Sequence, residues 1–336
     1  MGNIAQPFKF VARLILPQRA IFLLITFKDY WYDIKRYTRY SNTHYALDSA
    51  NKFKGRLTLF YHVIEKGLTM PETRLGFGTK VVNNLIELCN LYLKAGHSVK
   101  DPVFVHSIKV LNEYLRYHEK RKYTLEPQIV SRIKKLASKV NILNASNQYE
   151  FTEKEFFQHH NASFDKFCIS RHSARNFIEK EVPTDTIYHA IQLAMKSPSA
   201  CNRQPNRVYV VKDRDKFNQL LKLQSGNRGF GHLANGIIVI TSDISVFQNN
   251  DERKEASFNS GLFSMSLIYA LHFYKIGACL LNWSTSVEND IKLRGLLKIP
   301  DNEVITVTIA FGHLPEKFKI AISPRLEAQE VTTLLV

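Results

Sequence analysis

The sequence predicts two units, an all-helical region over residues 1–150 and an α/β or α+β unit over residues 151–336. A length of 336 residues suits two domains. The two halves differ in charge, since the first carries 24 Lys and Arg against 11 Asp and Glu, and the second carries 22 against 19. They also differ in periodicity, because apolar residues follow helical spacing throughout the first half, whereas helical and strand-like stretches alternate in the second.

The first half contains four apolar stripes with a spacing of three or four residues, which is typical of helices. Asp101-Pro102 predicts a helix start, with Asp as the cap and Pro in the first turn. Gly67 and Gly96 are predicted helix ends, and the polar stretch Asn144–Gln148 is the predicted linker. The stripes run from Leu57 to Ile64, Val81 to Tyr92, Val105 to Leu115 and Ile129 to Leu143.

The second half reads as alternating helices and strands around one sheet. One predicted helix, over residues 252–275, is apolar on several faces, so we expect it to be buried in a core or in a subunit interface. The other predicted helices are Thr184–Lys196 and Lys216–Leu223, and the predicted strands are Val208–Val211, Ile237–Thr241 and Val304–Phe311.

Composition and motifs exclude several classes of protein. Hydrophobic residues make up 45% of the chain and charged residues 23%, so a disordered chain is excluded. The four cysteines form no CxxC pair, which excludes a disulfide scaffold and a zinc ribbon and suits a reducing compartment. There is no Walker loop, GxGxxG, HExxH or GxSxG motif, so we expect no metal site.

Residues 8–45 interleave basic and aromatic side chains. The longest uncharged apolar run, Ala20–Phe27, is too short to cross a membrane. Two interpretations stay open, namely packing of the aromatic residues onto the rest of the protein and contact with an anionic membrane surface. The formal net charge of +16 comes without a nucleic-acid-binding signature, so we expect no nucleic-acid partner.

A further segment, His62–Gly78, joins a helix end to a Gly-rich loop at Arg74–Gly78. His62 and Glu65 are three residues apart and therefore share a helix face. They could serve acid–base chemistry or bind a metal, or they could be polar side chains of a helix end that meets solvent.

Three segments point to a ligand. Ser170–Phe177 holds two arginines and a serine within five residues, a compact set for an anion that arginine can bind bidentately. Ser197–Pro205 is rich in small and amide side chains, which allow close approach to a planar ligand. Ser323-Pro324-Arg325 places a cation after the last predicted strand.

Together and in this order, these segments resemble the nitroreductase family of flavoenzymes over about residues 167–325. The resemblance implies that FMN is the cofactor and that the phosphate-binding residues are Arg171, His172, Ser173, Arg175 and Arg325. It implies that the residues beside the flavin ring are Pro198, Ser199, Ala200, Asn202, Gln204, Asn227, Asn282 and Trp283. The chain departs from the family pattern at Asn206, Phe230 and Ser323, where an aromatic residue or a lysine is usual.

The resemblance also implies a central, mainly antiparallel sheet flanked by helices, and hence an α+β fold for the second unit. It implies a homodimer with FMN at the interface and helix 252–275 as an interface element. The implied reaction passes a hydride from NADH or NADPH through FMN to an unidentified small organic acceptor. No catalytic side chain is assigned, and the expected location is the cytoplasm, with peripheral contact at the inner face of the membrane.

A second hypothesis remains for the whole chain. The basic first half favours a redox-inactive flavin-fold scaffold or a membrane-surface docking protein, linked to bacterial surface-polysaccharide synthesis. We expect the helical half to pack beside the flavin unit as a cap, with the Arg74–Gly78 loop near the substrate side, and the alternative is a separate docking module for a membrane surface or another protein.

Overall fold

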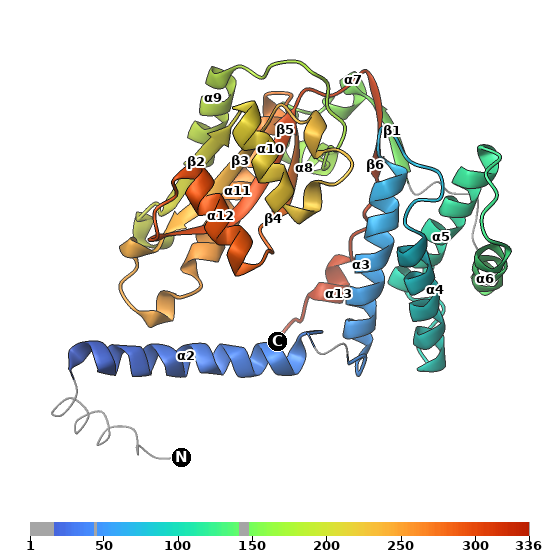
Figure 1. Cartoon of the computed structure of the whole chain (residues 1–336), viewed down its shortest axis with the longest axis horizontal. Helices are drawn as coiled ribbons and strands as arrows, with labels where there is room; N and C mark the ends of the chain where they lie inside the picture. Colours follow the sequence, from blue (N-terminus) through green and yellow to red (C-terminus); the bar gives the residue numbers. More distant parts are fainter. Residues whose placement is uncertain (1–16, 44–45, 141–147, 336) are drawn as a thin grey trace, which may run out of the picture.

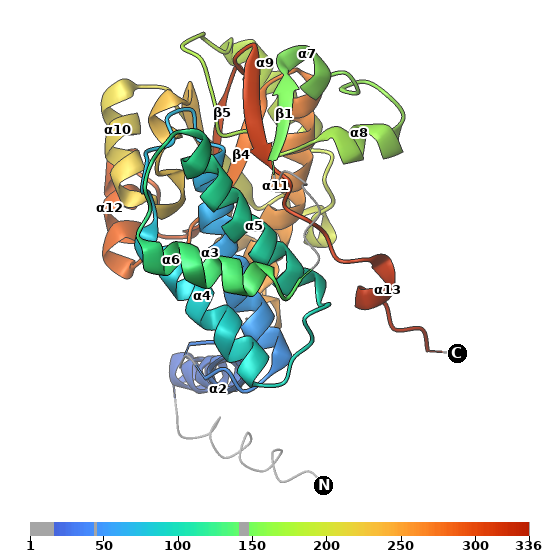
Figure 2. The same ribbon diagram turned by 90° about the vertical axis from the view of Figure 1, so that its right-hand side faces the viewer.

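The computed structural model describes residues 17–43, 46–140 and 148–335, and these form a helical unit followed by an α+β unit (Figure 1). The predicted order of an all-helical region before a sheet domain is confirmed. Two perpendicular views show the helical unit stacked on one side of the α+β unit (Figure 2), and helix α3 (Ala50–Leu68) of the helical unit contacts strand β6 (Lys317–Ala321).

The helical unit is built around one apolar core. Asp101 begins its third helix as predicted, because its carboxylate accepts a hydrogen bond from the Val103 N–H at 2.9 Å. Gly67 does not end its helix but lies inside the last turn, where the Phe77 ring packs so closely that a Cβ would come within 2.1 Å of it. The helices are α3 (Ala50–Leu68), α4 (Thr79–Lys94), α5 (Pro102–Lys120) and α6 (Pro127–Ala137).

The α+β unit contains a four-stranded sheet with the order β2-β3-β5-β4, and every neighbouring pair is antiparallel. The predicted α+β class is therefore confirmed. Three strands match predicted segments, whereas the sequence analysis did not identify β4 as a strand. The strands are β2 (Asn206–Val211), β3 (Gly236–Asp243), β4 (Gly277–Asn282) and β5 (Glu303–Gly312).

Alternate residues of β3 face two different apolar layers, which is why the strand reads as a continuous apolar run. Ile237 and Val239 belong to the core that includes residues of α10 (Arg214–Leu223) and α12 (Val287–Leu297). Ile238 and Ile240 belong to the core that includes residues of α9 (Thr184–Ala194) and α11 (Glu255–Phe273). The sheet is thus covered by helices on both faces.

A second, two-stranded sheet pairs β1 (Gln148–Thr152) with β6 (Lys317–Ala321) in antiparallel register. The predicted domain boundary at residue 150/151 therefore falls inside a strand, and the second unit begins at or before Gln148. Most of the predicted linker, together with the end of the fourth stripe, lies in residues 141–147, outside the described residues. The remaining short helices are α7 (Glu153–Phe156), α8 (Phe164–Ser170) and α13 (Ala328–Val331).

Helix α11 is the long helix predicted to be apolar on several faces. Phe263, Leu267 and Leu271 are buried against the sheet and α9. Phe258 on the opposite side is 60% exposed, so the described residues of one chain leave this face open.

Helix α2 (Gln18–Tyr40) runs along the bottom of the molecule in the view of Figure 1, below the α+β unit. It is tied to the α+β unit by Thr26, which hydrogen-bonds Asn250, and by Asp33, which pairs with Arg253 at 2.7 Å. No helix among the described residues is long and apolar enough to cross a membrane. Residues 8–16, 44 and 45 of the predicted basic-aromatic segment lie outside the described residues.

Candidate functional site

A cavity of about 800 Å³ lies where α3 meets the α+β unit. Its walls come from α3, α8, α11 and the segment after β6, which are far apart in the sequence. The structure brings together here all five residues predicted to bind the FMN phosphate. The lining residues of the predicted set are Arg171, His172, Ser173, Arg175 and Arg325.

The Ser170–Phe177 segment is held beside the central sheet. Helix α8 ends at Ser170, and the Ala174 N–H then donates to the Ala278 carbonyl of β4 at 3.0 Å. Ala174 and Phe177 are buried, which leaves Arg171 and Arg175 at the cavity. The apolar residues of the motif therefore anchor its cationic residues.

Arg171 and Arg175 each have a buried Nε atom with no hydrogen-bond partner. No ion pair within the described ranges includes either residue. Burial lowers the pKa of Arg171, and the neighbouring charge of Arg325 lowers it further. Because buried donors are almost always satisfied, two orphaned guanidinium donors fit an anionic ligand.

His172 lies beside these arginines and stacks near Phe151 and Phe156. Burial lowers its pKa, and the charges of Arg171 and Arg325 add to this effect. The ring is therefore neutral at pH 7, where it can donate one hydrogen bond and accept another.

Glu65 of α3 lines the same cavity and is fully buried. Its carboxylate accepts hydrogen bonds from His106 Nε2 at 3.0 Å and from the Ser323 N–H at 3.2 Å. Burial raises the pKa of Glu65, but the hydrogen bonds from His106 and His62 outweigh it, and the pKa falls to about 2. Glu65 is thus an ionised side chain that connects the helical unit to the segment carrying Arg325.

The sequence analysis left acid–base chemistry, metal binding and a solvated helix end open for His62 and Glu65. Both residues line the cavity, although Glu65 is not solvated. No group of three potential metal-ligating side chains occurs in the described part of the chain. His106, 41 residues from Glu65, was missed because no local spacing connects the two residues.

The predicted ring-side loop, which includes Pro198, Asn202 and Gln204, does not line this cavity. Ala200 N–H donates to Asn259 of α11, and Gln204 N–H donates to the Ser199 hydroxyl. Asn202 and Gln204 adopt left-handed φ values of 54° and 48°, so the loop holds a strained conformation that leaves both amide side chains exposed. Within one chain, the predicted cofactor residues therefore form separate groups.

The other three predicted ring-side residues lie around the turn after α10. Asn227 is buried, and its amide donates to the carbonyls of Leu221 and Gln224. The Gln224 side chain in turn donates to the Asn282 carbonyl at 2.9 Å, while Trp283 Nε1 donates to Asp290 at 2.8 Å. Asn227 and Trp283 thus have structural partners of their own.

Lys66 lies against this turn, does not line the arginine cavity and was not identified from the sequence. Its ammonium lies 3.5 Å from the Gly226 carbonyl. Burial lowers the pKa of Lys66, and Arg175 and then Arg228 lower it further. Its proximity in sequence to Glu65 was the only available signal.

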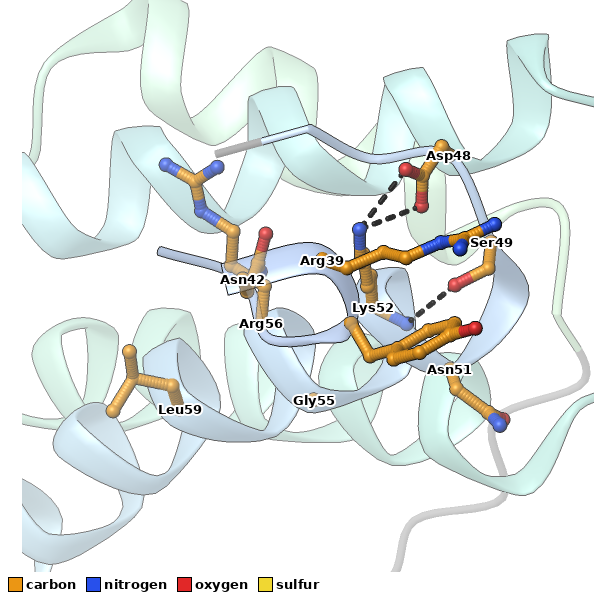
Figure 3. A pocket seen from close by; sticks show the side chains of 10 residues that line it. Arg39, Asn42, Asp48, Ser49, Asn51, Lys52, Gly55, Arg56 and Leu59 are labelled. Carbon is orange, nitrogen blue, oxygen red and sulfur yellow. Dashed lines mark hydrogen bonds and ion pairs between the residues drawn. The ribbon is translucent and has the colours of Figure 1, made fainter. Parts of the chain in front are cut away.

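Two other features of the helical unit lie away from this cavity. The Arg74–Gly78 loop folds back onto α5, where Gly76 N–H donates to His118 and the Phe77 ring stacks on it; the loop does not line the cavity. A second hollow of about 860 Å³ lies between the end of α2 and the start of α3 (Figure 3), and its Lys52 is paired with Asp48 at 2.9 Å. None of the predicted cofactor residues lines this hollow.

Part of the second unit is similar to known proteins. Residues 169–313 match the sequence model of the nitroreductase family. A putative NADH dehydrogenase/NAD(P)H nitroreductase of Archaeoglobus fulgidus is 26% identical over 151 residues, which are 44% of this chain and 83% of that protein. The matched family region includes neither α3 nor Arg325.

Solved structures show similarity over about half of the chain. A nitroreductase family protein of Streptococcus pneumoniae aligns at a TM-score of 0.46 and 22% identity, covering 52% of this chain and all of that one. The NADPH:FMN oxidoreductase of Vibrio harveyi aligns at a TM-score of 0.45 and 18% identity, covering 51% and 76%.

Proposed function

Because residues 169–313 are a nitroreductase-family domain, we propose that the chain is an FMN-dependent oxidoreductase that takes reducing equivalents from NADH or NADPH. The acceptor is a small organic molecule. The observation that carries this proposal is the cavity in which the buried Nε atoms of Arg171 and Arg175 have no partner. The named relatives, a putative NAD(P)H nitroreductase and an NADPH:FMN oxidoreductase, support the choice of cofactor and reductant.

The residues of the cavity fit the phosphate of FMN. Arg171 and Arg175 offer unused guanidinium donors, and Arg325 and the Ser173 hydroxyl line the same cavity. The neutral ring of His172 can donate a further hydrogen bond. When bound, FMN supplies the hydride chemistry, while these side chains hold and orient it.

The ring side of the site is completed, in this proposal, by a homodimer. Met265 and Tyr269 of α11 line the cavity, and Met265 and Phe258 are exposed on the face of α11 that the described residues of one chain leave open. A second copy packed on this face would exclude water from the cavity and could bring its own Pro198–Gln204 loop to it. This arrangement accounts for the separation of the predicted residues within one chain.

The experiment that tests the proposal measures FMN binding and reduction. We expect purified protein to bind FMN and the bound FMN to bleach when NADH or NADPH is added without oxygen. Arg171→Ala should lose FMN, whereas Arg132→Ala should not, because Arg132 pairs with Glu87 on the helical unit away from the cavity. A protein that binds FMN but is not reduced would instead support the redox-inactive scaffold.

We also propose that α2 rests on an anionic membrane surface at the inner face of the membrane, with the protein otherwise in the cytoplasm. This helix exposes many large apolar side chains, including Phe27 at 65% and Trp31 at 47%, next to Lys35 and Arg36. The four free cysteines agree with a reducing compartment.

The membrane proposal has a direct test. Vesicles containing anionic lipid should shift the Trp31 fluorescence to shorter wavelength, and high salt should reverse the shift. The variant Trp31→Phe identifies the signal, because Trp283 lies in the α+β unit. Absence of a shift, together with absence of cosedimentation, would contradict the proposal.

A further inference from the structure

We propose that Lys66 of α3 is a cofactor-binding residue, so that the helical unit contributes a cation to the FMN site. Lys66 lies against the turn at Gly226–Arg228 and feels the charge of Arg175, and we assign it to the polar edge of the flavin ring. This inference rests on the proposed FMN-dependent function and extends it to a helix outside the family-matched residues.

Two contacts place the end of α3 against the turn at Gly226–Arg228. Its ammonium reaches the Gly226 carbonyl at 3.5 Å, across 160 residues of sequence. One turn further along the chain, Met70 packs on Gly229, within 3.4 Å of where a Cβ of that glycine would lie. Met70 also joins the apolar core of the α+β unit, so the end of α3 is anchored over the turn.

Charge indicates that the site is built for a ligand. Lys66, Arg175 and Arg228 are near enough that the two arginines depress the pKa of the lysine. None of the three belongs to an ion pair within the residues that the structure describes. Like charges that converge without a counter-charge destabilise the protein until an electron-rich group joins them.

The nearest acid along α3 does not fill this role. Glu65 precedes Lys66 directly, and successive residues of a helix point about 100° apart. The Oε1 atom of Glu65 is bonded to His106 and to the Ser323 N–H, and its Oε2 atom faces His62 Nδ1 at 3.6 Å. The two neighbours therefore have different contacts: Glu65 binds the segment that carries Arg325, and Lys66 faces the turn at Gly226–Arg228.

A purely structural role for Lys66 does not account for the charge. A separation of 3.5 Å is beyond the usual range for an N–H···O hydrogen bond, so the contact to Gly226 is weak. Lys66 is partly buried, and one weak contact to a carbonyl compensates little for the water that its ammonium group loses there. A ligand with carbonyl oxygens, which becomes more electron-rich on reduction, supplies the missing partner, and the flavin ring of FMN has this chemistry.

The test compares Lys66→Met and Lys66→Arg with Lys52→Met. Methionine keeps the length and apolar contacts of the side chain and removes only the charge. Lys52 is the matched control because it lies on α3, is partly buried, and pairs with Asp48 away from the FMN site. Three quantities are measured, namely FMN affinity of the apoprotein by fluorescence quenching, the melting temperature of the apoprotein, and the midpoint potential of bound FMN.

We expect Lys66→Met to weaken FMN binding by about tenfold or more, the scale of one hydrogen bond to a charged group. The midpoint potential should fall, because a positive charge near the ring favours the reduced form. The apoprotein should melt at an unchanged or higher temperature, since repulsion with Arg175 and Arg228 is removed. Lys66→Arg should retain most of the affinity, and Lys52→Met should match the wild type.

Two outcomes overturn the inference. Unchanged FMN affinity and potential in Lys66→Met would show that the lysine does not reach the cofactor. A lower melting temperature of the apoprotein, accompanied by loss of affinity that arginine does not rescue, would show that Lys66 only clamps the two units. If wild-type apoprotein binds no FMN at all, the proposed function fails as well, which distinguishes that result from a failure of Lys66 alone.

Discussion

Replacing Glu65 by glutamine tests the buried network that joins the two units. The substitution keeps the size of the side chain and one acceptor oxygen but removes the charge. Because one pKa unit is a tenfold change in the proton equilibrium, the fall of the Glu65 pKa from 4.5 to about 2 corresponds to roughly 3 kcal/mol of stabilisation. Glutamine retains part of the hydrogen bonding, so we expect Glu65→Gln to destabilise the protein by about 2 kcal/mol at pH 7.

The dependence on pH gives the sharper test. The pKa of Glu65 is depressed in the folded protein, so its stabilisation is fully present above pH 4.5 and is lost as the pH falls toward 2. Urea unfolding of wild type and Glu65→Gln, followed by circular dichroism at several pH values between 7 and 3.5, should show two curves that converge at low pH. Glu87→Gln is the control, because Glu87 is 64% exposed in its pair with Arg132.

Two results would refute this reasoning about Glu65. One is a difference in unfolding free energy that stays constant across the pH range, which would mean that the side chain contributes packing and not charge. The other is an equal loss in Glu87→Gln, which would show that removing any carboxylate from this basic chain is destabilising.

Three further predictions follow from other contacts. Arg171→Ala should weaken FMN binding by about 1.5–3 kcal/mol, and Arg171→Lys should also lose affinity because an ammonium lacks the bidentate fork; a fluorescence titration with unchanged affinity would rule out the phosphate assignment. In α3, Gly55→Ala should stabilise the protein by about 0.5–1 kcal/mol, since a Cβ there meets nothing within 4 Å. Gly67→Ala should destabilise the protein, because its Cβ would lie 2.1 Å from the Phe77 ring. Thermal melts that rank the two variants in the opposite order would contradict this prediction. Burial lowers the pKa of His272 to about 4, so its NMR ring signals should not titrate between pH 8 and 5.5. The stability of the protein should decrease as the pH falls from 6.5 toward 4. An NMR titration midpoint near 6.5 for His272 would show that the ring is solvated.

The fold could be predicted where apolar patterns are long and local. The Ile237–Thr241 run and the helix at 252–275 are of this kind, and both appear in the structure as β3 and α11. Strands β1 and β6 were missed because each is only five residues long and the two pair across about 170 residues of sequence. Boundary errors follow from the same cause, since the strand at Gln148 is recognisable only beside its distant partner.

The candidate site could be predicted in part for a related reason. Arg171, His172, Ser173 and Arg175 are adjacent in sequence, so one short motif identified them, and the structure brings them to one cavity with Arg325. Lys66 and His106 come from the helical unit, and only their long-range contacts in the folded protein connect them to the site. The sequence contains no spacing that connects either residue to the arginine motif.

Because α3 packs in the helical core with Leu57 and Ile64 while Glu65 and Lys66 contact the α+β unit, the chain should tolerate being divided into two polypeptides. Fragments covering residues 1–140 and 148–336 would each keep their own elements, and α3 would rejoin them without a peptide connection. A cofactor that is bound by side chains of both fragments would bind only the associated pair. Added FMN should therefore lower the concentration at which the two fragments associate. The flavin would then serve as a reporter of complementation between the halves as well as a redox group.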